Sequence, residues 1–191
     1  MGWKELVIFF SCIVIVSLLG CNNFLKNYYT NEEGGNRPKK SKFTLNTPSY
    51  NLTKGDLIDT VAVYVNKTEM YYGEKTHIDF HYLRFFKNGQ YMEDLVSKKE
   101  DLNLLNFNNV NNSLMIGYFN IQNKKYIQLE YFRVKYGEGG FYDKRQGYIK
   151  NDSIFLFYKE YDKNDFPIPN KKNCRIYIKE KVEGLTGTPD W

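Results

Sequence analysis

The stretch IDFHYLRFFKNGQYM, residues 78–92, decides the fold class. Aromatic and aliphatic residues, which pleated surfaces favour, dominate the run from Ile78 to Phe86. Asn88-Gly89 then separates this run from Tyr91-Met92. This dipeptide is a strong hairpin signal, because a type I′ turn needs positive φ at both central residues. We therefore predict an antiparallel hairpin.

The same pattern of apolar run and short polar turn recurs along the chain. The other runs lie at 61–65, 117–121, 125–134, 147–150, 153–158 and 173–182. Consecutive hairpins of this kind describe an up-and-down antiparallel meander rather than a βαβ protein. We predict an all-β domain of about eight strands that forms a closed barrel, with a sandwich as the alternative.

One segment between these runs favours a short helix. Ser97-Lys98-Lys99-Glu100 resembles a capping box, and Leu102, Leu104 and Leu105 would supply one apolar face. The Asn-rich stretch 106–112 would end the helix.

Composition and charge narrow the classes of function. The chain holds 17 Tyr and 14 Phe but only 2 Trp, and its net charge of +5 is spread along its length. A nucleic-acid binder usually concentrates positive charge on one face or segment. The one dense basic group is Arg37, Lys39, Lys40 and Lys42. We therefore expect no nucleic-acid partner.

The N-terminal residues have the organisation of a signal peptide. Lys4 precedes the apolar run from Leu6 to Leu19, which is shorter than the ~20 residues needed to span a bilayer as a helix. A retained transmembrane anchor and ordinary secretion are therefore weaker alternatives. The run ends at Leu18-Leu19-Gly20-Cys21, which resembles the lipobox of bacterial lipoproteins. The resemblance implies removal of residues 1–20 by cleavage between Gly20 and Cys21, and lipidation of the Cys21 thiol.

Residues 21–50 follow as the lipidated cysteine and a predicted flexible tether. The segment is rich in Asn, Lys, Gly and Ser and offers few apolar side chains to pack, so disorder is the expectation. The β-domain is expected to occupy residues 51–191.

The remaining cysteine has a structural interpretation. Cys12 lies in the part to be removed and Cys21 would carry lipid, so Cys174 has no partner for an internal disulfide. Cys174 alternates in phase with Ile176 and Ile178. We predict that it is a small buried apolar side chain.

The lipobox, the tether and a repeated Gly-Tyr-Phe/Ile, polar turn, Ile-x-Leu pattern make the chain similar to bacterial lipoproteins with a lipocalin-like β-barrel. The repeated pattern occupies 117–129 and 147–156. The resemblance implies a lipocalin-like barrel. The many aromatic residues of the meander favour a small apolar ligand, since barrel mouths can hold one.

Catalytic and metal motifs are scarce. His77, Asp79 and His81 alternate and share one strand face, but next-but-one neighbours are ~6.5–7 Å apart, so both histidines cannot reach one ion. A Gly-rich phosphate loop, GxSxG, HExxH and paired Cys motifs are all missing from the sequence. We expect no metal, no cofactor and no catalytic residue.

These observations predict a non-enzymatic lipoprotein of a bacterial cell envelope, anchored to a membrane that we expect to be the outer one. Its barrel would bind a small apolar or amphipathic ligand, although the sequence identifies no ligand-binding residue. The alternative is an accessory protein of an envelope complex whose barrel is filled by its own side chains. An envelope hydrolase is the third hypothesis.

Overall fold

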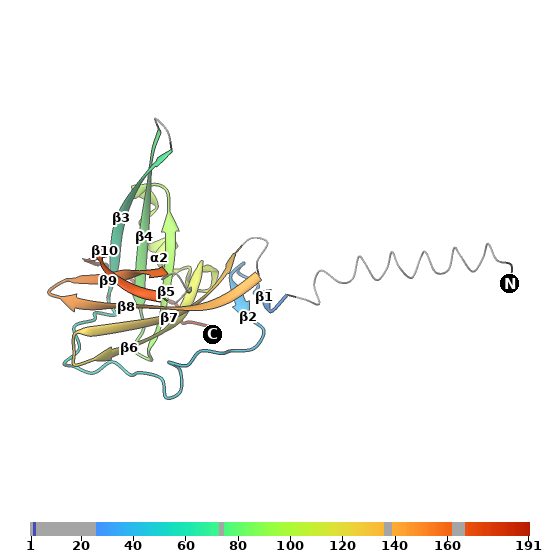
Figure 1. Cartoon of the computed structure of the whole chain (residues 1–191), viewed down its shortest axis with the longest axis horizontal. Helices are drawn as coiled ribbons and strands as arrows, with labels where there is room; N and C mark the ends of the chain where they lie inside the picture. The colour runs from blue at the N-terminus through green and yellow to red at the C-terminus, as the bar shows by residue number, and fades with distance from the viewer. Residues whose placement is uncertain (1, 3–25, 73–74, 136–138, 162–166) are drawn as a thin grey trace.

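The computed structural model describes residue 2 and residues 26–72, 75–135, 139–161 and 167–191 (Figure 1). Residues 3–20 of the predicted signal peptide and the lipidation site Cys21 therefore lie outside the described residues. The barrel strands are β3 (Ala62–Tyr72), β4 (Lys75–Phe85), β5 (Gln90–Val96), β6 (Met115–Gln122), β7 (Tyr126–Lys135), β8 (Gly139–Lys150), β9 (Ser153–Tyr161) and β10 (Pro167–Lys181).

The eight strands form one closed antiparallel barrel in the order β10-β3-β4-β5-β6-β7-β8-β9. Each strand pairs with its neighbour in sequence, and β10 closes the barrel against β3, with Ile178 opposite Val65 and Lys181 opposite Ala62. The predicted all-β meander is confirmed, and closure into a barrel removes the sandwich alternative.

The hairpin that decided the fold class is present, but its turn is not the predicted type. Phe85 pairs with Tyr91 across β4 and β5. The Gly89 amide donates to the Phe86 carbonyl at 3.2 Å, and φ is positive at Gly89 (82°) but not at Asn88. The loop is therefore one residue longer than a type I′ connection. Successive positive φ values occur instead at Asn123 (50°) and Lys124 (60°), between β6 and β7.

The repeated Gly-Tyr pattern has a packing explanation. A Cβ at Gly117 would lie 2.0 Å from the Glu130 carbonyl oxygen, and one at Gly147 would lie 1.9 Å from that of Phe155. Both glycines allow neighbouring strands to approach closely.

The predicted helical segment exists with a different cap and a different buried face. It consists of η1 (Lys99–Asp101), α2 (Leu104–Asn108) and η2 (Val110–Asn112). Asn103 caps α2 by accepting from the Asn106 amide, whereas Ser97 donates to Asp79. Leu105 is 80% exposed, and the side chains buried are Phe107 and Val110. The Asn-rich stretch therefore forms part of the helix and of the turn after it. Phe107 and Val110 cover the outer face of β3, β4 and β5.

The predicted tether is wrong over its described part, because residues 27–50 pack on the barrel. Within them β1 (Tyr28–Thr30) and β2 (Asn36–Pro38) form a hairpin. Arg37 is 1% exposed: its Nε donates to Asp190 at 2.6 Å, its Nη2 donates to the Asn111 carbonyl at 2.8 Å, and its guanidinium lies over the Trp191 ring.

Two further contacts hold the rest of this N-terminal arm. The Phe43 ring packs edge-on against Tyr118 and Tyr142 on the outer face of the barrel. The buried Glu130 carboxylate accepts hydrogen bonds from the backbone amides of Thr44 (2.6 Å) and Leu45 (2.8 Å). A polar segment is thus ordered by a few specific contacts rather than by a large apolar face, and the folded domain begins well before residue 51.

The last strand is inverted relative to its predicted phase. Ile176 and Ile178 are 42% and 57% exposed, and Cys174 is only partly buried. Tyr177 is fully buried inside the barrel, on the face that Arg175 shares. The prediction that Cys174 is a buried apolar side chain is therefore wrong, because Cys174 shares the outward face of Ile176 and Ile178.

Candidate ligand site inside the barrel

The lower end of the barrel is filled by the protein itself. Residues 50–60 cross this end (Figure 1), where Tyr50, Leu52 and Ile58 pack against the interior apolar cluster. The larger fully buried members of that cluster are Tyr64, Leu83, Phe85, Tyr91 and Phe119. Within the crossing segment the Tyr50 hydroxyl donates to Asp56 at 2.8 Å, and the Asp59 amide donates to the Tyr64 hydroxyl of β3 at 2.9 Å, which ties the segment to the barrel.

A buried ion pair lies next to this apolar layer. Glu93 on β5 is 0% exposed and is paired with Arg145 from β8, on the opposite side of the barrel. The Tyr177 hydroxyl of β10 donates to the same carboxylate at 3.0 Å. Burial raises the pKa of Glu93, but Arg145, His81 and the Tyr177 hydrogen bond together outweigh it, so the net pKa is lowered. Glu93 is therefore ionised at neutral pH.

Two further interior groups complete what we call the interior polar cluster: Glu93, Arg145, Tyr177, His81 and Arg175. The Arg175 Nη1 lies 3.3 Å from the His81 Nδ1, and the same ring nitrogen is 3.8 Å from the Glu93 carboxylate. Burial and the neighbouring Arg175 lower the pKa of His81. His81 is therefore neutral at pH 7 and can accept or donate a hydrogen bond.

The members of the interior polar cluster differ in burial. The side chains of His81 and Arg145 are 13% and 14% exposed although they point inward, whereas Glu93 and Tyr177 beneath them are fully buried. The inward residue next along β5, Leu95, is also partly exposed. Solvent therefore contacts part of His81 and Arg145 but not Glu93 or Tyr177.

Aromatic residues follow the cluster along β7 and β8. The Arg145 guanidinium lies over the Tyr131 ring, 4.6 Å from its centroid, and the Tyr131 hydroxyl donates to Asp143 at 2.9 Å. Arg133 lies over the neighbouring Phe141 ring at 4.7 Å. The Tyr131 ring of β7 and the Phe141 ring of β8 are thus each contacted by an arginine.

A buried polar cluster of this kind contributes little net free energy to the stability of a barrel. Removing two charges from water costs several kcal/mol per ion, and a packed apolar pair is often as stable. Buried groups with displaced pKa values are instead typical of functional sites. The arrangement can orient a small molecule by hydrogen bonds to its polar group, with Tyr131 and Phe141 beside its apolar part.

The sequence prediction for His77, Asp79 and His81 is confirmed in its geometry. All three side chains lie on one face of β4, but they take part in two separate groups of contacts. The His77 Nε2 is 2.9 Å from the Asp79 carboxylate, while His81 joins the interior polar cluster. Within the described part of the chain, no group of His, Cys, Asp or Glu side chains could hold a metal ion.

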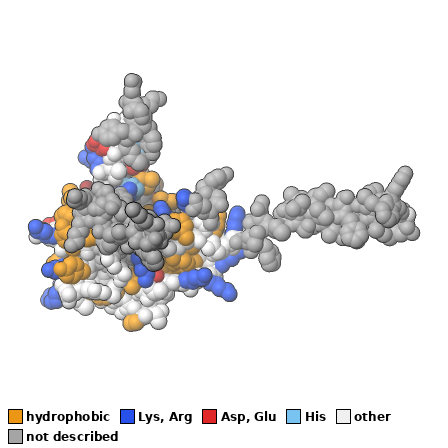
Figure 2. Space-filling model, viewed as in Figure 1, with side chains coloured by type: hydrophobic (Ala, Val, Ile, Leu, Met, Phe, Trp, Pro, Cys, Tyr) orange, Lys and Arg blue, Asp and Glu red, His pale blue; other side chains and the backbone are white. Residues whose placement is uncertain are grey.

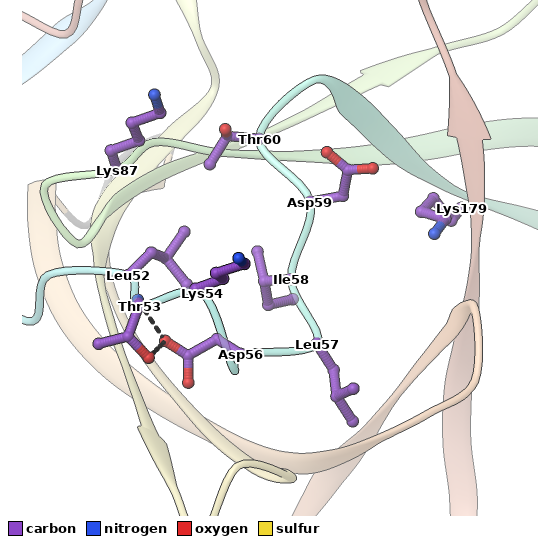
Figure 3. A pocket seen from close by; sticks show the side chains of 10 residues that line it. All are labelled: Leu52, Thr53, Lys54, Asp56, Leu57, Ile58, Asp59, Thr60, Lys87 and Lys179. Carbon is purple, nitrogen blue, oxygen red and sulfur yellow. Dashed lines mark hydrogen bonds between the residues drawn. The ribbon is translucent and has the colours of Figure 1, made fainter.

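A second hollow lies at the lower end, and Figure 3 shows its lining. Its volume is about 460 Å³, and its wall is the segment Leu52–Thr60 together with Lys87 and Lys179. Thr53 and Asp56 bond to each other across it, the Thr53 amide donating at 2.6 Å (Figure 3). Its polar groups are thus largely engaged in shaping the loop, which leaves the interior polar cluster as the stronger candidate.

Comparison with known proteins adds no assignment. No protein-family model, no curated protein and no solved structure matches this chain. Among the described residues, no helix is both long and apolar enough to cross a bilayer.

Sequence reasoning missed Glu93, Arg145, Tyr177 and Arg175 as site residues. Glu93 is in phase with Tyr91, and Arg175 with Tyr177. On two predicted strands, a charged residue thus alternates in phase with an aromatic residue that is buried. This pattern could have indicated a polar group inside the barrel.

Proposed function

We propose that this chain is a lipoprotein of a bacterial cell envelope, anchored through lipid on Cys21, whose barrel binds a small amphipathic ligand without catalysing a reaction. The observation that carries the binding proposal is the buried Glu93–Arg145 pair with Tyr177, inside the barrel and next to its filled apolar end. The polar group of the ligand would contact His81 and Arg175, and its apolar part would lie against Tyr131 and Phe141.

The ligand site is tested by placing a larger side chain on the inner wall of the barrel. Leu95 lies opposite His81 on the inward face of β5, so Leu95→Trp should occupy the space beside the cluster and exclude the ligand. The matched control is Leu114→Trp, at a position 49% exposed on the outside. We expect native mass spectrometry of the protein extracted from membranes to show a bound small molecule in wild type and the control but not in Leu95→Trp. A wild-type mass without any adduct would contradict the proposal.

The anchor is tested at the thiol itself. A single acyl chain binds a membrane only marginally, whereas two or more hold a protein stably. We expect Cys21→Ala to abolish incorporation of labelled palmitate and to leave the precursor uncleaved, while Cys174→Ala behaves as wild type in both assays. Unchanged palmitate labelling of Cys21→Ala would rule out this site of lipidation.

One observation favours a second function, that of an accessory protein in an envelope complex. Tyr126, Tyr148, Phe155 and Ile176 stand opposite one another across β7, β8, β9 and β10, on the outer face. Tyr148 and Phe155 stack at 4.5 Å, and Tyr126 is 48% exposed. Aromatic residues are enriched at protein interfaces. A defined protein captured by a photo-crosslinker at Tyr126 in intact cells would favour this function over ligand binding.

A further inference from the structure

The described chain begins at a position that the fold holds firmly. The Asn27 side chain donates to the Gly140 carbonyl at 2.6 Å and accepts from the Gly140 amide at 2.9 Å. The Lys39 amide donates to the Asn27 carbonyl at 3.0 Å. The start of the arm is thus fixed to β8 and to the residue that follows β2.

Five exposed lysines surround this position, and we call them the exit lysines: Lys26, Lys39, Lys40, Lys42 and Lys135. The Tyr142 hydroxyl, two residues after Gly140, donates to the Lys40 carbonyl and accepts from the Lys42 amide, each at 3.0 Å. Lys135 pairs with Gly139 at the end of the β7–β8 ladder. Figure 2 shows Lys and Arg side chains gathered on this side of the molecule, where β1 and β2 lie in Figure 1.

The acidic side chains of the arm lie elsewhere. Glu32 and Glu33 belong to the turn of the β1–β2 hairpin, whose Asn31 donates to the Asn111 carbonyl at 2.8 Å and to Asp190 at 2.9 Å. The hairpin therefore places its negative end against the C-terminal residues and its positive end around Asn27. Tyr29, next to this positive end, is 50% exposed.

The length of chain between Cys21 and Lys26 limits where this surface can lie. Five residue steps can span at most ~18 Å, whatever conformation they take. A lipid on Cys21 would therefore hold the exit lysines close to the headgroups. Cytoplasmic and other anionic leaflets attract basic residues near their surface, and Tyr is enriched at that interface.

Resting on the proposed lipid anchor, we propose that the exit lysines bind anionic phospholipid headgroups of the membrane that carries the anchor. The barrel is then held in one orientation on the bilayer instead of turning freely about its linker. Lys54 and Lys87 line the hollow at the lower end of the barrel, which lies apart from β1 and β2 in Figure 1.

The test is lysine acetylation of the full lipidated protein on two kinds of vesicle, followed by mass spectrometry. One kind is phosphatidylcholine alone and the other contains about 30% phosphatidylglycerol. We expect Lys39, Lys40 and Lys42 to react roughly fivefold more slowly on the anionic vesicles, and the difference to vanish in about 0.5 M salt. Lys54 and Lys87 should react equally on both.

A triple variant separates charge from simple crowding. In Lys39→Gln/Lys40→Gln/Lys42→Gln, the protection of Lys26 and Lys135 on anionic vesicles should disappear. The matched variant Lys54→Gln/Lys87→Gln/Lys98→Gln should retain it. Flotation is measured in every arm: protein that floats but shows equal acetylation on both vesicles overturns this proposal alone. Wild-type protein that floats with neither vesicle overturns the lipid anchor and this proposal with it.

Discussion

Replacing Arg145 with Met lowers the free energy of unfolding by about 3–5 kcal/mol, the effect expected when one partner of a buried ion pair is removed. The substitution keeps much of the apolar volume of the side chain but leaves the Glu93 carboxylate, 0% exposed, without its cation. The Tyr177 hydroxyl remains as a donor and cannot neutralise the charge. Urea denaturation at neutral pH measures the effect.

Two controls show that the loss comes from the unpaired charge. The double variant Arg145→Met/Glu93→Leu should recover most of the stability, because it removes both charges together. Lys67→Met breaks the surface pair with Glu69, whose side chains are 51% and 42% exposed, and should change stability by about 0–1 kcal/mol. A loss in Arg145→Met no larger than that of Lys67→Met would contradict the buried pair.

The Glu93–Arg145 pair also makes the free energy of unfolding depend on pH. The pKa of Glu93 in the folded protein lies below its ordinary value of 4.5, because Arg145 and its other partners outweigh the effect of burial. The unfolded chain therefore takes up a proton first as the pH falls. The contribution of Glu93 is complete above pH 4.5 and is lost below it, so the gap between wild type and Arg145→Met should narrow in acid.

Replacing Arg37 with Ala releases the N-terminal arm from the barrel. The substitution removes the bond to Asp190, the bond to the Asn111 carbonyl and the contact with the Trp191 ring. Hydrogen bonds to charged groups contribute about 1.5–3 kcal/mol each, so we expect the arm to dock more weakly by about 2–4 kcal/mol. Limited trypsin digestion should then cleave at Lys39 and Lys40 at least tenfold faster, since local opening governs the rate.

Lys42→Ala serves as the control for Arg37→Ala, because it removes a positive charge from an exposed side chain of the same arm. It should leave cleavage at Lys39 and Lys40 within about twofold of wild type. Equal cleavage in Arg37→Ala and wild type would show that Arg37 does not hold the arm.

The strands and their order could be predicted because the information is local. Each hairpin is encoded by an apolar run and the turn that follows it, and a series of hairpins leaves few topologies open. The face of a strand that turns inward is less local. In β10 the aliphatic residues Ile176 and Ile178 suggested the buried face, yet the interior residue is Tyr177, whose hydroxyl donates to the buried Glu93.

The arm and the site depended on partners that are distant in sequence. Composition averaged over 21–50 predicts disorder, but Arg37 is ordered by Asp190, which is 153 positions away. Glu93 and Arg145 are 52 positions apart on strands that face each other across the barrel. No pattern within one segment pairs them, so the sequence predicted the barrel but not the polar residues inside it.

The contact between the first and last barrel strands also sets the timing of folding. Ala62 on β3 pairs with Lys181 on β10, so this pairing cannot form until Lys181 has been synthesised. The bond between Arg37 and Asp190 forms later still, because Asp190 follows Lys181 in the chain. Domains dominated by such long-range pairings fold slowly, on a scale of milliseconds to seconds, because chain closure must precede its stabilising contacts. A chain that closes slowly stays unfolded for longer, which suits the envelope lipoprotein that we propose, because such a protein must cross a membrane.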